Sequence, residues 1–207
     1  MNTRELRFLW CADLYRYAGR TDIGTSLRYL MISEGYKYSF LMRLCQYLAK
    51  TSWKALARPF YLLSMSILRH YQYKFGISIC PSVAIGSGLY IGHFGGIVVN
   101  DGCIIGKNCN ISHDVTIGAS YRGDKQGIPK IGNNVFIGPG AKIFGAIRVG
   151  DNVAIGSNSV VTHDVPDNAV VAGIPAKIIS FKGSDGYINR TDYADSAFSR
   201  HTMESCH

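Results

Sequence analysis

Two histidines stand where an imidazole could do acid–base chemistry. His93 lies in the glycine-rich stretch Gly92–Gly96, and His113 follows twenty residues later, directly before Asp114. An imidazole titrates near neutral pH, so it can take a proton from a hydroxyl and return it to a leaving group. A lone histidine is more often structural, so the interpretation depends on the elements that hold these residues.

Those elements follow from a six-residue repeat that begins near Gly76. Aliphatic residues recur every six positions from Ile131 to Val161 without a slip, often with glycine after them. This period is typical of a parallel β-helix, in which three short strands form a coil of about eighteen residues and point aliphatic side chains inward. Eighteen of the 23 glycines fall between 76 and 180, where they suit the corners of the coils. We therefore predict a mainly β fold with a parallel β-helix over 76–180; the alternative is a glycine-rich β-sandwich.

The repeat is interrupted twice. It slips by two residues after Ile97, and we place the slip at Asn100-Asp101-Gly102. The second interruption, residues 119–129, is polar and carries no repeat. Insertions in repeat proteins form loops that often line the binding face, so we expect a flap over the active site, with a decorative loop as the alternative.

One coil plus the slip separates the two histidines. We therefore expect His93 and His113 at equivalent places on adjacent coils, about 5 Å apart. His113 or Asp114 would then line an acceptor pocket beside His93. A ladder of polar side chains on the outer surface explains the same spacing equally well.

The N-terminal segment, residues 1–75, is expected to be helical. Apolar residues at helical spacing predict two or three short helices and a long one from about Ser39 to Tyr73, which Pro59 should start, kink or break. The segment holds 12 Lys/Arg and 4 Asp/Glu, which accounts for the whole net charge of +8. It could contact an anionic membrane or an acidic substrate, or be a solvated basic face. Nucleic-acid binding has no recognisable module.

The longest uncharged run of this segment, residues 59–68, is about half the length that a membrane-spanning helix needs. We therefore predict no transmembrane helix and leave an interfacial one open. Charged residues among the first twenty positions argue against a signal peptide. After residue 180 the chain is a polar tail, 181–207, expected to be poorly ordered or to form an arm on a neighbouring subunit.

Six cysteines occur without a CxxC pair, so we predict no metal site. Reduced thiols fit a cytoplasmic protein, with peripheral contact of residues 1–75 at the inner membrane as a further hypothesis. Cysteine nucleophiles at Cys80, Cys103 or Cys109 are a weaker alternative to a histidine base; Cys103 and Cys109 are expected to pack as small apolar residues.

Residues 76–180 resemble the hexapeptide-repeat acyltransferases. Within them the region is similar to the serine O-acetyltransferase group, and we judge it closest to relatives that O-acetylate bacterial capsule, O-antigen or exopolysaccharide. Three stretches carry the resemblance: residues 88–99 around His93, residues 129–141, and residues 160–166 followed by 172–177. The helical stretches 13–17 and 36–40 also look like those of the polysaccharide relatives.

The resemblance implies a left-handed parallel β-helix, a homotrimer, and acetyl-CoA as co-substrate without a metal. It implies that His93 is the general base and that CoA lies in a groove between two β-helices. The residues expected along the pantetheine and nucleotide are Pro139, Ser157, Thr162 and His163. Lys177 should pair with phosphate, unless it is a solvated surface lysine.

Three positions depart from the serine O-acetyltransferases. The resemblance implies that those enzymes have an acidic residue where this chain has Gly92 and another near the position of Ser78. It also implies a second histidine where this chain has Ile128. Those groups orient the base and hold the charged ends of the amino acid. Their absence favours a sugar hydroxyl in surface-polysaccharide biosynthesis as the acceptor. The alternatives are a serine O-acetyltransferase of cysteine biosynthesis and a non-catalytic β-helix scaffold.

Overall fold

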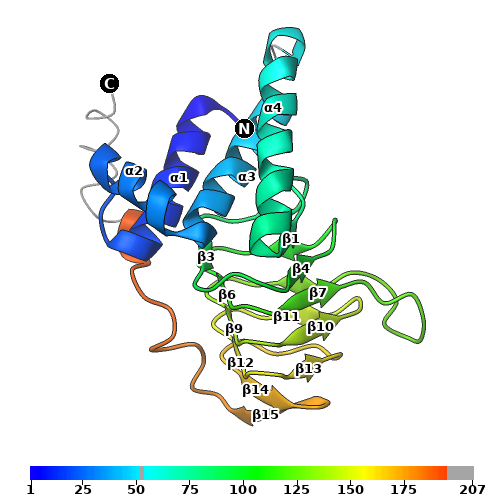
Figure 1. Ribbon diagram of the computed structural model, residues 1–207. Coiled ribbons are helices and arrows are strands. Elements are labelled where there is room, and N and C mark those ends of the chain that lie inside the picture. The colour runs from blue at the N-terminus through cyan, green and yellow to red at the C-terminus, as the bar shows by residue number, and fades with distance from the viewer. Residues whose placement is uncertain (52–53, 195–207) are drawn as a thin grey trace.

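The computed structural model describes residues 1–51 and 54–194, in which helices stack on one end of a column of short strands (Figure 1). The helices are α1 (Thr3–Ala18), α2 (Ile23–Ile32), α3 (Glu34–Lys50) and α4 (Lys54–Phe75). Side chains of Asn2, Asp22 and Ser33 cap the first three by accepting a backbone N–H of the first turn. No helix in the described residues combines the length and the hydropathy needed to cross a bilayer.

The expected single helix from Ser39 to Tyr73 is wrong. α3 ends at Lys50 and α4 starts at Lys54, while Pro59 lies inside α4 without ending it. The chain reverses between the two helices so that they pack together, and Met42 of α3 and Leu68 of α4 lie fully buried in one core. One continuous helix would have left these apolar faces without a partner.

The strands wind into a parallel β-helix with three sheets, as predicted. The first sheet contains β1 (Ile77–Ile79), β4 (Ile97–Val99), β7 (Thr116–Gly118), β10 (Lys142–Phe144) and β13 (Val160–Val161). The second contains β2 (Ala84–Ile85), β5 (Ile104–Ile105), β8 (Lys130–Ile131) and β11 (Arg148–Val149). The third contains β3 (Tyr90–Ile91), β6 (Asn110–Ile111), β9 (Phe136–Ile137), β12 (Ala154–Ile155), β14 (Val170–Gly173) and β15 (Ala176–Ser180).

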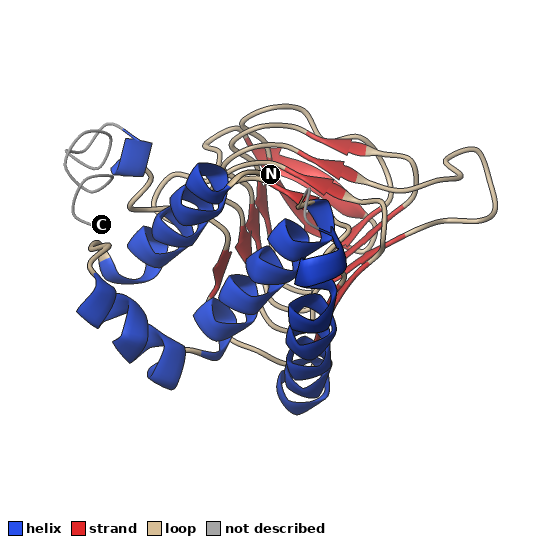
Figure 2. Ribbon diagram, turned by 90° about the horizontal axis from the view of Figure 1, so that it is seen from above, coloured by secondary structure: helices blue, strands red, loops and turns tan. Residues whose placement is uncertain are grey.

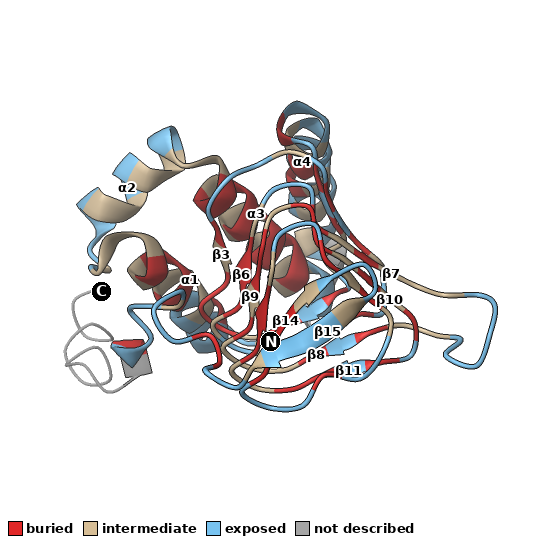
Figure 3. Ribbon diagram, turned by 90° about the horizontal axis from the view of Figure 1, so that it is seen from below, coloured by how far each residue is buried: buried red, intermediate tan, exposed pale blue. Residues whose placement is uncertain are grey.

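Among the named strands of the described residues, only β15 runs antiparallel to its neighbour, β14. It closes the end of the column opposite the helices, and its exposed residues are seen in Figure 3. Inward aliphatic side chains from successive coils stack in register, and all of them are buried, as for Ile111, Ile137 and Ile155. The six-residue spacing therefore builds one continuous core.

Asparagines form a ladder at one corner of the coils. Asn108, Asn134, Asn152 and Asn168 all adopt a left-handed φ between 52° and 60°. Each of the first three donates its side-chain amide to the asparagine of the next coil, at 2.9 to 3.2 Å. Asparagine tolerates this φ and satisfies its neighbours at the same time.

The two-residue slip lies at the histidine and not at residues 100–102 as predicted. Tyr90 of β3 pairs with Asn110, whereas Val98 of β4 pairs with Thr116. The offset falls from 20 to 18 residues between β3 and β4, so the two extra residues belong to the corner 92–96. Counting by six misplaced them because Ile97 and Val99 both point inward and are buried.

Two tyrosines cap the open end of the first coil, which has no coil above it. The hydroxyl of Tyr17 accepts the N–H of Ile91 at 2.8 Å and donates to its carbonyl at 3.1 Å. Tyr38 does the same for Ile79, at 3.1 and 2.8 Å. The edge groups of β1 and β3 are thereby satisfied without a further strand.

A buried ion pair caps the remaining strand. Arg43 of α3 donates to the carbonyls of Ile85 and Gly86 at 2.7 and 2.6 Å, and to Asp13 of α1 at 3.1 Å. Asp13 also accepts the N–H of Leu89 at 2.9 Å. Both charged side chains are only 1 % exposed. The pair thus joins two helices to the end of the β-helix.

The described part of the tail packs on its own chain, contrary to expectation. After β15, residues 181–194 run back outside the third sheet towards α1 (Figure 1). The ring of Tyr187 stacks on Phe136 at 4.4 Å, and the hydroxyl of Tyr193 lies 2.8 Å from that of Ser87. A short 3-10 helix, η1 (Asp192–Ala194), ends this segment. Residues 195–207 lie outside the described residues.

Candidate active site

The corners that follow β3, β6, β9 and β12 form one edge of the β-helix, which we call the histidine edge. The core isoleucines before these corners pair in register from coil to coil. The residues two positions after them therefore form a column, which consists of His93, His113, Pro139 and Ser157. Four of the predicted site residues lie together on this edge.

The two histidines are neighbours on adjacent coils, which confirms the predicted placement. Their ring centroids are 6.0 Å apart with an interplanar angle of 77°. Both residues are exposed, and neither imidazole makes a hydrogen bond within residues 1–51 and 54–194. His93 is therefore open to a substrate, and its ring lies edge to face with that of His113. The catalytic role of His93 stays a prediction.

Asp114 is tied to Lys142, a residue that the sequence analysis did not single out. Lys142 of β10 donates to the Asp114 carboxylate at 2.9 Å, and the Asp114 N–H donates to the carbonyl of Gly95 at 2.7 Å. These contacts join the corner of His113 to the corner of His93. Of the two predicted acceptor residues, His113 lies beside the ring of His93, and Asp114 joins the two corners.

The other predicted CoA residues lie elsewhere. Thr162 and His163 follow β13 on the opposite side of the first sheet, at a corner that we call the loop edge, and Thr162 Oγ1 lies 3.0 Å from His163 Nδ1. Lys177 is on β15 at the end of the column. One chain does not bring all five predicted CoA residues to one place.

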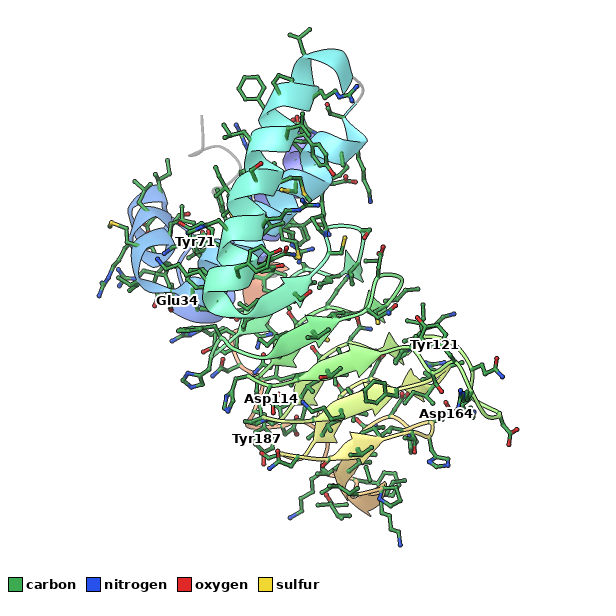
Figure 4. All side chains as sticks on the ribbon, turned by 45° about the vertical axis from the view of Figure 1, so that its right-hand side comes forward. Glu34, Tyr71, Asp114, Tyr121, Asp164 and Tyr187 are labelled. Atoms are coloured by element: carbon green, nitrogen blue, oxygen red, sulfur yellow. The ribbon has the colours of Figure 1, made fainter. Side chains whose placement is uncertain are left out.

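The polar loop 119–129 also leaves from the loop edge. It connects β7 to β8 and extends away from the helices in Figures 1 and 2. Its Lys125 pairs with Asp164 at 3.0 Å, and Figure 4 shows Tyr121 and Asp164 on the side away from Asp114. The loop cannot cover the His93 of its own chain, so a flap role requires a second chain.

The start of α3 and the end of α4 lie over the histidine corner. Gly35 packs so closely on Ile91 that a Cβ there would be 2.2 Å from the Ile91 carbonyl oxygen. Gly76, directly after α4, lies over Gly95 and Gly96, with its Cβ position 3.2 Å from the Gly96 nitrogen. The helices therefore form a roof on both sides of His93, which the sequence analysis missed.

Cys103 and Cys109 do not supply a nucleophile to this site. Cys103 and Cys109 are 1 % exposed and pack in the core, as predicted. Burial raises the pKa of the Cys103 thiol to about 11 and that of Cys109 to about 12, so both stay protonated at neutral pH. The described residues contain no group of three or more side chains that could hold a metal ion.

Comparison with known proteins gives consistent matches. Residues 128–163 match the family model described as bacterial transferase hexapeptide (six repeats). The serine acetyltransferase of Buchnera aphidicola subsp. Acyrthosiphon pisum is 36 % identical over 180 residues, covering 86 % of this chain and 62 % of the relative. The probable serine acetyltransferase 1 of Oryza sativa subsp. japonica is 32 % identical over 180 residues, covering 87 % and 57 %. The chain thus spans about three fifths of these curated relatives.

The fold matches solved structures at a similar level. The serine acetyltransferase of Brucella abortus strain S19 in complex with coenzyme A has a TM-score of 0.69 and 33 % identity, covering 86 % of this chain and 69 % of that one.

These matches overturn the predicted sugar acceptor. Each relative reported is a serine acetyltransferase, and a closeness to polysaccharide enzymes is not found. The alignments span most of the chain, so they include helical residues whose pattern we attributed to the polysaccharide relatives. The prediction gave too much weight to Gly92, Ser78 and Ile128, three positions within an otherwise similar fold.

Proposed function

The chain belongs to the serine acetyltransferase group of the hexapeptide-repeat transferases, and we propose that it moves an acetyl group from acetyl-CoA to the hydroxyl of L-serine. The similarity to serine acetyltransferases over 86 % of the chain carries this proposal. The exposed His93, open on the histidine edge, supports it. We place the reaction in the cytoplasm, since the five described cysteines are free thiols.

In the proposed reaction His93 acts first as base and then as acid. It removes the proton of the serine hydroxyl while the oxygen attacks the thioester carbonyl carbon. The carbon–sulfur bond then breaks, and the imidazolium gives its proton to the departing CoA thiolate. Backbone N–H groups around Gly95 and Gly96 would stabilise the oxyanion of the tetrahedral intermediate. No covalent enzyme intermediate is needed.

We further propose that three chains assemble around a threefold axis. Apart from Lys177, the predicted residues divide between the two edges of the first sheet, so a complete site needs the histidine edge of one chain beside the loop edge of the next. CoA would lie in that groove along Pro139, Ser157, Thr162 and His163, with Lys177 near a phosphate. Sedimentation equilibrium should give three times the chain mass of 22.8 kDa. A fully active monomer would contradict the two-chain site.

A thiol-release assay tests the acceptor. With acetyl-CoA present, we expect CoA thiol to appear rapidly with L-serine and at background rate with L-threonine or without an acceptor. Serine is small, so a pocket under the helical roof should discriminate against the added methyl group by roughly 10- to 200-fold. Equal thiol release with and without serine would remove serine as the acceptor.

A further inference from the structure

Lys37, on the first turns of α3, has an ammonium group without an anionic partner near the histidine corner. Its Nζ lies 5.6 Å from the ring centroid of Tyr71 and 5.6 Å from that of Phe75, both on α4. The ammonium also donates a long hydrogen bond to the carbonyl of Met31, at 3.5 Å, so its one hydrogen-bond acceptor in the described residues is uncharged. Within the described residues no carboxylate lies within ion-pair distance of Lys37. Aromatic faces hold the cation in place and leave it free to bind an anion.

A row of aromatic rings links Lys37 to the candidate base. The ring of Phe75 stacks on Tyr71 at 4.9 Å and lies 5.8 Å from the ring of Phe94. Phe94 follows His93 directly and is half exposed. Lys37 therefore contacts a row of rings that ends at the residue directly after His93.

Glu34 complements Lys37 from the same turn of α3. Residues three positions apart lie on one side of a helix, yet Glu34 and Lys37 do not form an ion pair with each other. Glu34 directly precedes Gly35, whose backbone packs on Ile91, two residues before His93. Figure 4 shows Glu34 where α3 meets the β-helix, on the side where Asp114 also lies. Within residues 1–51 and 54–194, Glu34 and Lys37 thus carry opposite charges on the first turns of α3, and neither forms an ion pair.

Serine has the matching charges, since the carbon next to its hydroxymethyl group carries both a carboxylate and an ammonium. The positions Gly92, Ser78 and Ile128 lack the charged and imidazole groups that the family resemblance assigns to holding these two ends. Other residues of this chain must do so if serine is to be held at His93. We propose that Lys37 binds the carboxylate and Glu34 the ammonium of the amino-acid acceptor; this assignment rests on the proposed function.

Acceptors that lack one charge test each contact separately. Serinamide has no carboxylate, and 3-hydroxypropionate has no ammonium. Lys37→Gln should lower kcat/KM for L-serine about tenfold or more and leave that for serinamide unchanged, because the lost contact is a charge-assisted hydrogen bond. Glu34→Gln should lower kcat/KM for serine similarly and leave that for 3-hydroxypropionate unchanged. The KM for acetyl-CoA should stay the same in both variants.

The control is Arg69→Gln, which removes an exposed cation of the same helical layer and should change none of these values. Equal losses of kcat/KM with serine and serinamide in Lys37→Gln would mean that Lys37 only stabilises the packing of the helices. Unchanged kinetics with serine would also overturn the assignment.

Calorimetric titration with L-serine measures binding without acetyl transfer, so it tests this proposal separately from the proposed reaction. Serine binding that is weakened by Lys37→Gln supports the site even if no thiol is released, whereas absent binding refutes it.

Discussion

Replacing His93 with alanine should lower kcat for acetyl transfer to serine by about 10²- to 10⁴-fold, the usual contribution of a positioned general base. The imidazole is exposed on the histidine edge, and its nearest described aromatic neighbour is the ring of His113. Without it, no group we assign to the corner takes the hydroxyl proton as the oxygen attacks the thioester. Initial rates of thiol release at saturating serine and acetyl-CoA measure the loss.

The matched control is His113→Gln, which changes the neighbouring ring of the same column. We expect it to raise the KM for serine several-fold and to leave kcat within about tenfold, since His113 would line the acceptor pocket and not move the proton. Because His93 is exposed, His93→Ala should unfold at the wild-type temperature. Near-wild-type turnover of His93→Ala would exclude it as the base.

The second large effect concerns the buried ion pair between Asp13 of α1 and Arg43 of α3. Asp13→Asn should lower the free energy of unfolding by about 3–5 kcal/mol, because it leaves the Arg43 guanidinium buried without its counter-charge. Burial raises the pKa of the Asp13 carboxyl, and the charge of Arg43 opposes that rise. The charged form of each side chain is therefore stabilised by the charge of the other. Urea unfolding at one fixed protein concentration measures the change.

The double variant Asp13→Leu/Arg43→Met separates capping from ion pairing. If the pair only balanced its own charges, an apolar replacement would restore the lost stability. We expect it to stay destabilised, because the carbonyls of Ile85 and Gly86 and the N–H of Leu89 lose their partners. Lys125→Met, which breaks an exposed pair, should change stability by less than about 1 kcal/mol. A double variant as stable as the wild type would show that the pair is not needed as a cap.

The β-helix could be predicted because its signal is local and repeated. Each step of six from Ile131 to Val161 reports the same event, a side chain that turns into the core. Counting the aliphatic residues in steps of six failed only where two inward residues, Ile97 and Val99, stand two positions apart. There it placed the extra residues after β4, although they widen the histidine corner.

The helical layer was harder to predict because its contacts are distant in sequence. Tyr17, Tyr38 and Arg43 bind backbone groups at positions 79 to 91, and no periodicity reveals such pairs. A charged residue within an apolar helical pattern, such as Arg43, was the one available signal. The end of α3 at Lys50 was also missed, because Pro59 was expected to mark the interruption and instead lies inside α4.

The acceptor was the largest error, and its cause is physical. The groups that the family resemblance assigns to positions 78, 92 and 128 are missing in this chain, and their absence predicted an uncharged acceptor. The roof of α3 and α4 brings other charges, Glu34 and Lys37, over the same corner, and sequence spacing alone could not place them there.

The most direct measurement identifies the product. Purified protein, acetyl-CoA and L-serine should yield O-acetylserine, detected by mass spectrometry as serine that carries one acetyl group, in amounts equal to the CoA released. His93→Ala should yield almost none. A wild-type mixture in which CoA is released while serine stays unmodified would contradict acetyl transfer to serine at the histidine edge.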